Sequence, residues 1–219
     1  CRCYTNSSQR PESQEKEACL MARYTGPKRR LSRREGIPLF TKDEKALERK
    51  GAVPPGPYGL RRKRKLSEYG LQLREKQKAK RMFGILERQF SNYFKRASKV
   101  KGETGIALLK FLEMRLDNIV YKLGFSKSRA GARQLVSHGH ITVDGKKATI
   151  PSVNVKLQQI VALSGKISDN IQVGKALEES TLPEWLERKA TVGKVLRIPS
   201  REEMEQSVNE QLIVEFYSR

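Results

Sequence analysis

The sequence predicts an α+β fold in which helices come first and a small sheet follows. Apolar residues recur at three- and four-residue steps over about 85–98 and 104–123, which is the periodicity of amphipathic helices. After Gly139, short alternating runs flank Asp144-Gly145, a dipeptide that favours the type I′ turn of a hairpin. The third observation is charge. The 219 residues include 45 Lys and Arg against 24 Asp and Glu, a net charge of +21, which favours a polyanionic partner.

The positive charge is concentrated in one part of the chain. Residues 21–100 carry 24 basic against 7 acidic side chains, whereas residues 167–219 carry 7 against 10. Nucleic acid is the usual partner of such a field, and an anionic membrane surface is the alternative. No stretch approaches the roughly 18 apolar residues of a membrane span. Three Cys cannot supply the framework of a disulfide-stapled secreted domain.

The N-terminal part has no predicted core of its own. Residues 1–20 are polar and balanced in charge, so we interpret them as a disordered leader or an artefact. Residues 21–61 are basic and punctuated by Gly and Pro, and we expect an extended arm that becomes ordered only against a partner. One short helix is expected near Thr41, because Thr41 and Glu44 can form a capping box.

The remaining elements follow from periodicity, caps and turns. In chain order we predict a basic helix over 68–82 capped by Ser67, an amphipathic helix over 85–98, one continuous helix over 104–123, a helix over 128–137 capped by Ser128, the hairpin over 140–150 and a strand over 159–163. The last third is less regular, with a helix over 170–180, a turn or short helix over 183–186, and strands or extended tails over 192–198 and 212–216. The aromatic residues of 85–98 are expected in the core and not as a platform for bases.

The sequence favours no catalytic or metal chemistry. All three thiols lie in residues 1–20 and supply one ligand too few for a four-ligand zinc site. His138 and His140 flank a Gly corner without a nearby carboxylate to orient them, so they are interpreted as turn or RNA-contact residues. No phosphate-binding or dinucleotide-binding glycine motif is present. We therefore expect no enzyme, no catalytic residue, no metal and no cofactor.

Basic side chains gather in one predicted helix–helix–hairpin unit. Arg129 and Arg133 are four residues apart and share a helix face. Arg and Lys are the side chains that bind phosphate, although a solvated basic surface is the simpler alternative. The unit presents seven candidates, namely Arg115, Lys127, Arg129, Arg133, His140, Lys146 and Lys147. We expect reversal of charge at both Arg129 and Arg133 to weaken RNA binding and to leave the fold intact.

Longer motifs carry a resemblance to a known family. Residues 112–136 (LEMRLDNIVYKLGFSKSRAGARQLV) and 137–145 (SHGHITVDG) resemble the signature of the S4 RNA-binding domain. Residues 21–28 (MARYTGPK) and 69–78 (YGLQLREKQK) resemble the corresponding segments of the bacterial or organellar small-subunit ribosomal protein S4 family. The resemblance covers about residues 21–219.

The resemblance implies an architecture and a set of contacts. The fold would be an arm over 21–61, a discontinuous all-helical domain over 62–112 with 177–219, and an inserted small α/β S4 domain over 113–176. Many relatives carry a four-Cys zinc knuckle in the arm, but residues 24–60 contain no Cys, so the chain resembles the zinc-free type. The signature adds Ser128, Gln134 and His138 to the RNA-contact candidates. Position and charge add the arm residues Lys28, Arg29, Arg30, Arg33, Arg34, Arg61 and Arg62.

The resemblance also implies a function. Family members bind small-subunit ribosomal RNA early in assembly, in the 5′ domain, and contribute to messenger entry and decoding accuracy. The implied partners are this RNA, neighbouring small-subunit proteins and, in some members, messenger RNA, with no DNA and no membrane. The implied place is the cytoplasmic ribosome of a bacterium, or the ribosome of a plastid or mitochondrion. The alternatives are an RNA-binding regulator or an RNA-modifying enzyme that acts off the ribosome.

Overall fold

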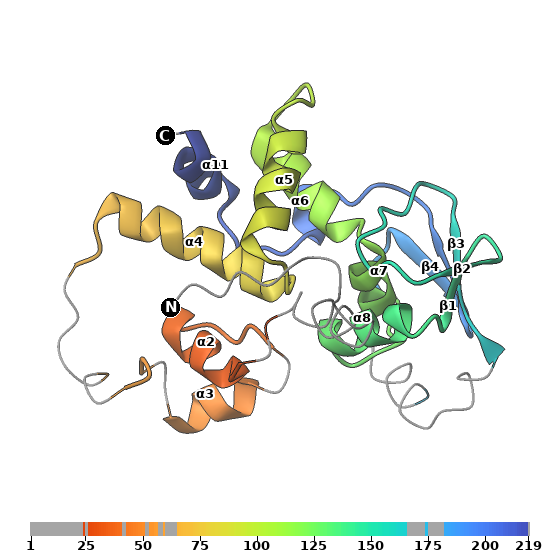
Figure 1. The fold of residues 1–219 in the computed structure, drawn as a ribbon, viewed down its shortest axis with the longest axis horizontal. Helices are drawn as coiled ribbons and strands as arrows, with labels where there is room; N and C mark the ends of the chain where they lie inside the picture. Colours follow the sequence, from red (N-terminus) through yellow and green to blue (C-terminus); the bar gives the residue numbers. More distant parts are fainter. Residues whose placement is uncertain are drawn as a thin grey trace, which may run out of the picture.

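The computed structural model shows a helical lobe and a sheet lobe joined near residue 114 (Figure 1). The helical lobe consists of α4, α5, α6 and α11, and the sheet lobe consists of α7, α8 and strands β1 to β5. No helix among the described residues is long and apolar enough to cross a membrane. The structure describes residues 24, 26–40, 43–50, 53–56, 59, 65–165, 174 and 182–218.

The helical lobe packs around buried side chains from all of its helices, among them Phe90, Leu108, Leu112 and Ile213. Its helices are α4 (Glu68–Met82), α5 (Glu87–Ala97), α6 (Thr104–Glu113) and α11 (Glu210–Ser218). The Ser67 hydroxyl accepts a hydrogen bond from the Gly70 N–H at 3.2 Å, as expected for the cap of α4.

α11 corrects the expectation of a strand or extended tail over 212–216. That segment is a nearly continuous apolar run, and such a run does not distinguish a strand from a buried helix. The choice is made by packing: α11 lies against α4 and α6, with Ile213 buried between them and Tyr217 stacked on Phe94 at 4.5 Å between ring centroids.

The sheet lobe has its core between one face of the sheet and two helices, with Ile119, Phe125, Val161 and Trp185 fully buried. Its helices are α7 (Leu116–Lys122) and α8 (Arg129–Ser137). The strands β1 (Ile141–Val143), β2 (Lys146–Ala148), β3 (Ile160–Leu163), β4 (Leu186–Lys189) and β5 (Val192–Val195) form an antiparallel sheet in the order β2-β1-β3-β5-β4.

Strands β4 and β5 correct the expected division of the chain. Residues 177–219 were assigned to the helical domain, yet β5 pairs with β3 and Trp185 enters the core of the sheet lobe. The chain returns to the helical lobe only afterwards, through the 3₁₀ turn η2 (Arg201–Glu203) and the buried Met204 and Val208. Gly193 is central to this packing, because a side chain there would collide with Leu123 of the sheet-lobe core.

The hairpin and the cap of α8 confirm local predictions. Asp144 and Gly145 both have positive φ, 49° and 77°, as a type I′ turn requires. The Ser128 hydroxyl accepts a hydrogen bond from the Gly131 N–H at 3.2 Å and caps α8. The predicted strand over 159–163 is β3.

The helix expected over 104–123 is instead two helices, α6 and α7, separated by Met114 and Arg115. Arg115 is extended, with φ −67° and ψ 140°. The break is held by the loop after β2, because the Leu116 N–H donates to the Val153 carbonyl at 2.8 Å and Arg115 forms a bridge with Asn154. The apolar spacing continues across the break, so periodicity alone does not reveal it.

The arm also differs from the expected extended chain. Lys28–Glu35 forms α2, and Glu44–Lys50 forms α3, the short helix that was predicted, although its expected cap Thr41 lies outside the described residues. The buried Ser32 hydroxyl donates to the Asp43 carboxylate and ties the two segments together. The Glu35 carboxylate accepts hydrogen bonds from Arg74 and Arg81 of α4. The described arm is therefore ordered by contacts within the chain and not only by a partner.

Candidate nucleic-acid interface

The corner where α8 meets the hairpin brings several predicted RNA-contact residues together. Gly139 turns the chain there with φ 71°, a backbone conformation that favours glycine, and the end of the exposed Lys147 side chain lies against it. The His138 and His140 rings stand 6.0 Å apart between centroids. His138 and Lys147 are exposed and His140 is half-buried.

Further exposed groups surround this corner. Gln134 precedes His138 by one helical turn on α8, and Lys146 and Lys147 lie on the edge strand β2. Lysines on an edge strand also prevent pairing with other sheets, which is the structural alternative to RNA binding. We define the α8–hairpin corner as the exposed or half-buried residues Gln134, His138, His140, Lys146 and Lys147. The exposed Lys127 precedes α8 and lies at the other end of that helix.

Arg115 does not belong to this corner, contrary to the sequence-based expectation. Its side chain is 1% exposed. Its guanidinium donates to both carboxylate oxygens of Asp117, at 3.0 and 2.7 Å, and to the Tyr93 hydroxyl at 2.9 Å. Burial lowers the pKa of Arg115, but these bonds outweigh it and raise the pKa overall. Arg115 is a structural cation at the junction of the two lobes.

Arg129 and Arg133 are also largely engaged within the protein. Arg129 donates to the Asn118 side chain at 2.9 Å and to the Glu205 carboxylate, and its guanidinium lies 5.1 Å from the Phe83 ring centroid. Arg133 donates to Asp117 at 3.4 Å. The contacts of Arg129 with Glu205 and Phe83 tie α8 to the helical lobe, whereas Arg133 binds α7 within the sheet lobe. From these contacts we expect charge reversal at both positions to disturb the fold, whereas the sequence alone led us to expect that the fold stays intact.

The buried carboxylate of Glu113 is linked to Arg129 through the Asn118 side chain. The Asn118 amide donates to one oxygen of Glu113 at 2.6 Å, and the other oxygen has no hydrogen-bond partner among the described residues. Burial raises the pKa of Glu113 in spite of the cations Lys122 and Arg129 nearby. Glu205 is also desolvated, but the same two cations lower its pKa. The polar network therefore connects α6, α7 and α8 with the segment before α11.

The arm presents a second group of cations. Lys28, Arg29, Arg30 and Arg34 are exposed on α2. Arg33 is half-buried instead, because its guanidinium donates to the Val53 carbonyl at 2.9 Å and fixes the following segment of the arm. Of the remaining candidates, Ser128 serves as the α8 cap, and Arg61 and Arg62 lie outside the described residues.

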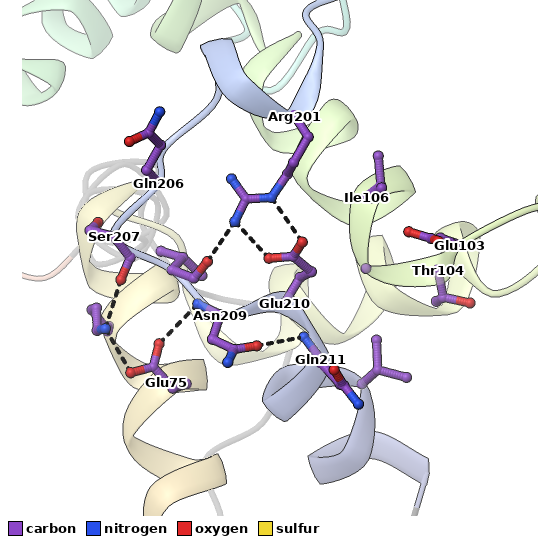
Figure 2. Close-up of a pocket in the computed structure, with 14 residues that line it drawn as sticks. Glu75, Glu103, Thr104, Ile106, Arg201, Gln206, Ser207, Asn209, Glu210 and Gln211 are labelled. Atoms are coloured by element: carbon purple, nitrogen blue, oxygen red, sulfur yellow. Dashed lines mark hydrogen bonds and ion pairs between the residues drawn. The ribbon is translucent and has the colours of Figure 1, made fainter.

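A hollow with a volume of about 730 Å³ lies in the helical lobe. Figure 2 shows that its polar side chains bind one another. Arg201 donates to both oxygens of Glu210, at 2.8 and 2.7 Å. Lys78 bridges the Ser207 carbonyl and Glu75. These bonds fasten the segment before α11 to α4. Within the described part of the chain, no group of three or more His, Cys, Asp or Glu side chains could hold a metal.

Sequence reasoning missed one exposed basic surface, on α5. Arg88, Asn92, Lys95 and Lys99 recur at four- and three-residue steps and all are exposed. The same helical periodicity that identified the aromatic residues of this segment as core would have revealed this opposite face.

Comparisons with known proteins agree with this arrangement. Residues 23–113 match the family model described as the ribosomal protein S4/S9 N-terminal domain. Residues 114–161 match the S4 domain, so the two matches meet at the break between α6 and α7. The fold and the basic corner thus define an S4-domain protein.

Curated relatives specify the family. The chain is 55% identical over 209 residues to a protein of Dictyoglomus turgidum, and that alignment covers 91% of this chain and 100% of the relative. It is 51% identical over 205 residues to a protein of Akkermansia muciniphila and 49% identical over 211 residues to one of Herpetosiphon aurantiacus, with the same coverage. All three relatives are named small ribosomal subunit protein uS4. The chain belongs to this uS4 family.

Proposed function

We propose that this chain is a structural constituent of the small ribosomal subunit that binds small-subunit ribosomal RNA. The observation that carries the proposal is the cluster of cations and imidazoles at the α8–hairpin corner of a chain whose relatives are named for this subunit. The role is structural and not catalytic. The bacterial relatives favour a ribosome in a bacterial cytoplasm over one in a plastid or mitochondrion.

Binding at the corner rests on phosphate contacts and on the shape of the RNA. The deep major groove of A-form RNA does not admit side chains that read sequence, so folded RNA is recognised by its backbone geometry. Lys146 and Lys147 supply point charges, and Gln134 and His138 supply hydrogen-bonding groups on the adjacent helix. The exposed cations of α2 add a second point of attachment.

The finer role follows from family resemblance. We infer that the chain binds during early assembly, in the 5′ domain, and contributes to messenger entry and decoding accuracy. Neighbouring small-subunit proteins are its protein partners, and messenger RNA is a further ligand. We infer no DNA or membrane partner.

Co-sedimentation tests the proposal against its alternatives. We expect the chain to sediment with small subunits from a bacterial lysate and to remain there after a wash at physiological salt. Sedimentation with free messenger RNA alone would favour an RNA-binding regulator. Isomerisation of uridine by the pure protein would favour an RNA-modifying enzyme.

A further inference from the structure

The α5 helix has two faces of opposite character. Phe90, Tyr93 and Ala97 face the interior and are buried. The other face presents Arg88 and Lys95, and Lys99 follows just beyond the end of the helix; all three are exposed and have no acidic partner among the described residues. Its one carboxylate, Glu87, is exposed but is engaged by α4, because Lys76 and Lys80 donate to it at 2.8 and 3.0 Å. The outer face is therefore uniformly basic or neutral.

A groove of about 280 Å³ runs beside this face, between α5 and the loop that follows β2. It is lined by Gln89, Asn92, Tyr93, Arg96, Ser152 and Val153. The lining contains two carboxamides and one guanidinium and has no carboxylate. The Arg96 side chain is exposed, and its guanidinium lies 5.9 Å from the Tyr93 ring centroid.

The groove is held open by bonds that form without a ligand. The Tyr93 hydroxyl accepts a hydrogen bond from the buried Arg115 at 2.9 Å and donates to the Ser152 carbonyl at 3.4 Å. The Val153 carbonyl accepts from the Leu116 N–H at 2.8 Å. Both walls are therefore fixed to the lobe junction, and a ligand would not have to order them on binding.

We propose that this groove holds one unpaired nucleotide of the bound RNA, an inference that rests on the proposed function. A carboxamide presents a donor and an acceptor side by side, which matches the hydrogen-bonding edge of a base. Gln89 and Asn92 therefore bind the base edge, and the Arg96 guanidinium stacks on the base or binds its phosphate. Arg88, Lys95 and Lys99 bind the phosphates on either side.

The volume of the groove and its lining side chains both favour a single unpaired nucleotide as the ligand. A groove of about 280 Å³ admits a single nucleotide and excludes a duplex. Bases in loops and bulges of RNA are splayed out and offer their edges to side chains, whereas paired bases do not. The lining also disfavours an acidic peptide, because such a ligand needs cations and the groove itself is lined mainly by carboxamides and backbone.

The test compares one double variant of the groove with a matched double variant as its control, both in the full chain. Gln89→Ala with Asn92→Ala removes both carboxamides without changing charge. Gln206→Ala with Gln211→Ala removes two exposed carboxamides at a distant site, beside the hollow of Figure 2. Affinity for small-subunit ribosomal RNA is measured over a salt series, and the RNA in each complex is mapped with a base-specific chemical probe.

We expect the groove variant to bind about tenfold more weakly, equivalent to about 1.4 kcal/mol, with an unchanged salt slope, because no charge is lost. One unpaired nucleotide should become reactive in its complex, while the rest of the footprint and the control variant stay as in the parent chain. Arg96→Gln gives a separate check, and should weaken binding and also reduce the salt slope.

The outcomes separate the two proposals. If the parent chain shows no specific binding, the proposed function fails and the groove inference falls with it. If the parent chain binds and the groove variant has the same affinity and footprint, only the groove inference is overturned. A groove variant whose circular dichroism shows a lost fold is replaced by Arg96→Gln, whose unchanged affinity would likewise overturn the inference.

Discussion

Replacing Arg115 by Leu should destabilise the fold far more than it disturbs RNA binding. The substitution leaves Asp117, which is 5% exposed, without the guanidinium that binds both of its carboxylate oxygens. Removing one member of a buried ion pair typically costs about 3–5 kcal/mol. Arg133 remains 3.4 Å from the same carboxylate and offsets part of this loss. We therefore expect a loss of about 3 kcal/mol in the free energy of unfolding.

Equilibrium unfolding in urea measures this loss, with fluorescence of the buried Trp185 as the probe. The double variant Arg115→Leu with Asp117→Leu is the control. It should recover part of the stability, because it leaves no unpaired charge in the interior.

Two results would refute the reasoning. A loss of less than about 1 kcal/mol would mean that the pair is worth no more than a surface salt bridge. A tenfold loss of affinity for ribosomal RNA with unchanged stability would mean that Arg115 contacts RNA directly, as the sequence alone predicted.

Three further predictions concern other elements. Hydrogen bonds from Lys76, Lys80 and Tyr217 outweigh burial and lower the pKa of Glu87 from 4.5 to about 2. The contribution of the Glu87 carboxylate to the free energy of unfolding is therefore complete above about pH 4.5 and is lost as pH falls toward 2. In urea titrations, the difference in stability between the parent chain and Glu87→Gln should be present near neutral pH and should disappear between pH 4.5 and 2. Gly145→Val should cost about 1–2 kcal/mol in the same assay because of its positive φ, and an unchanged midpoint would argue against the turn. Arg129→Glu places two carboxylates together at Glu205 and should lower the thermal midpoint. Lys147→Glu on the exposed edge strand should instead weaken RNA binding at an unchanged midpoint. Equal midpoints for both variants would contradict a stabilising contact between Arg129 and Glu205.

Local chemistry made part of the fold predictable. The hairpin follows from Asp144-Gly145, since few sequences accept positive φ at both positions. The start of α8 follows from Ser128, whose hydroxyl satisfies an N–H of the first turn. These features depend on residues within a few positions of each other, so the sequence contains all the information needed.

Non-local contacts decided the rest. β5 joins β3 across more than twenty intervening residues, so no local pattern assigned it to the sheet lobe. The sequence identified Arg115 as a cation of the S4 signature, but it could not place the Tyr93 hydroxyl beside it. The same limit applies to Arg129, because Glu205 approaches it from a segment 76 residues away. Cations near one another in sequence were therefore divided by tertiary packing into buried and exposed groups.

The most direct test of the central claim is binding of the full chain to small-subunit ribosomal RNA over a salt series, with transfer RNA and random duplex as competitors. We predict a specific complex that survives competition at physiological salt. Its logarithmic salt slope should be about −0.7 to −0.9 for each phosphate neutralised. Equal binding to every RNA, abolished by salt, would contradict the account and leave only the net charge to explain the interaction.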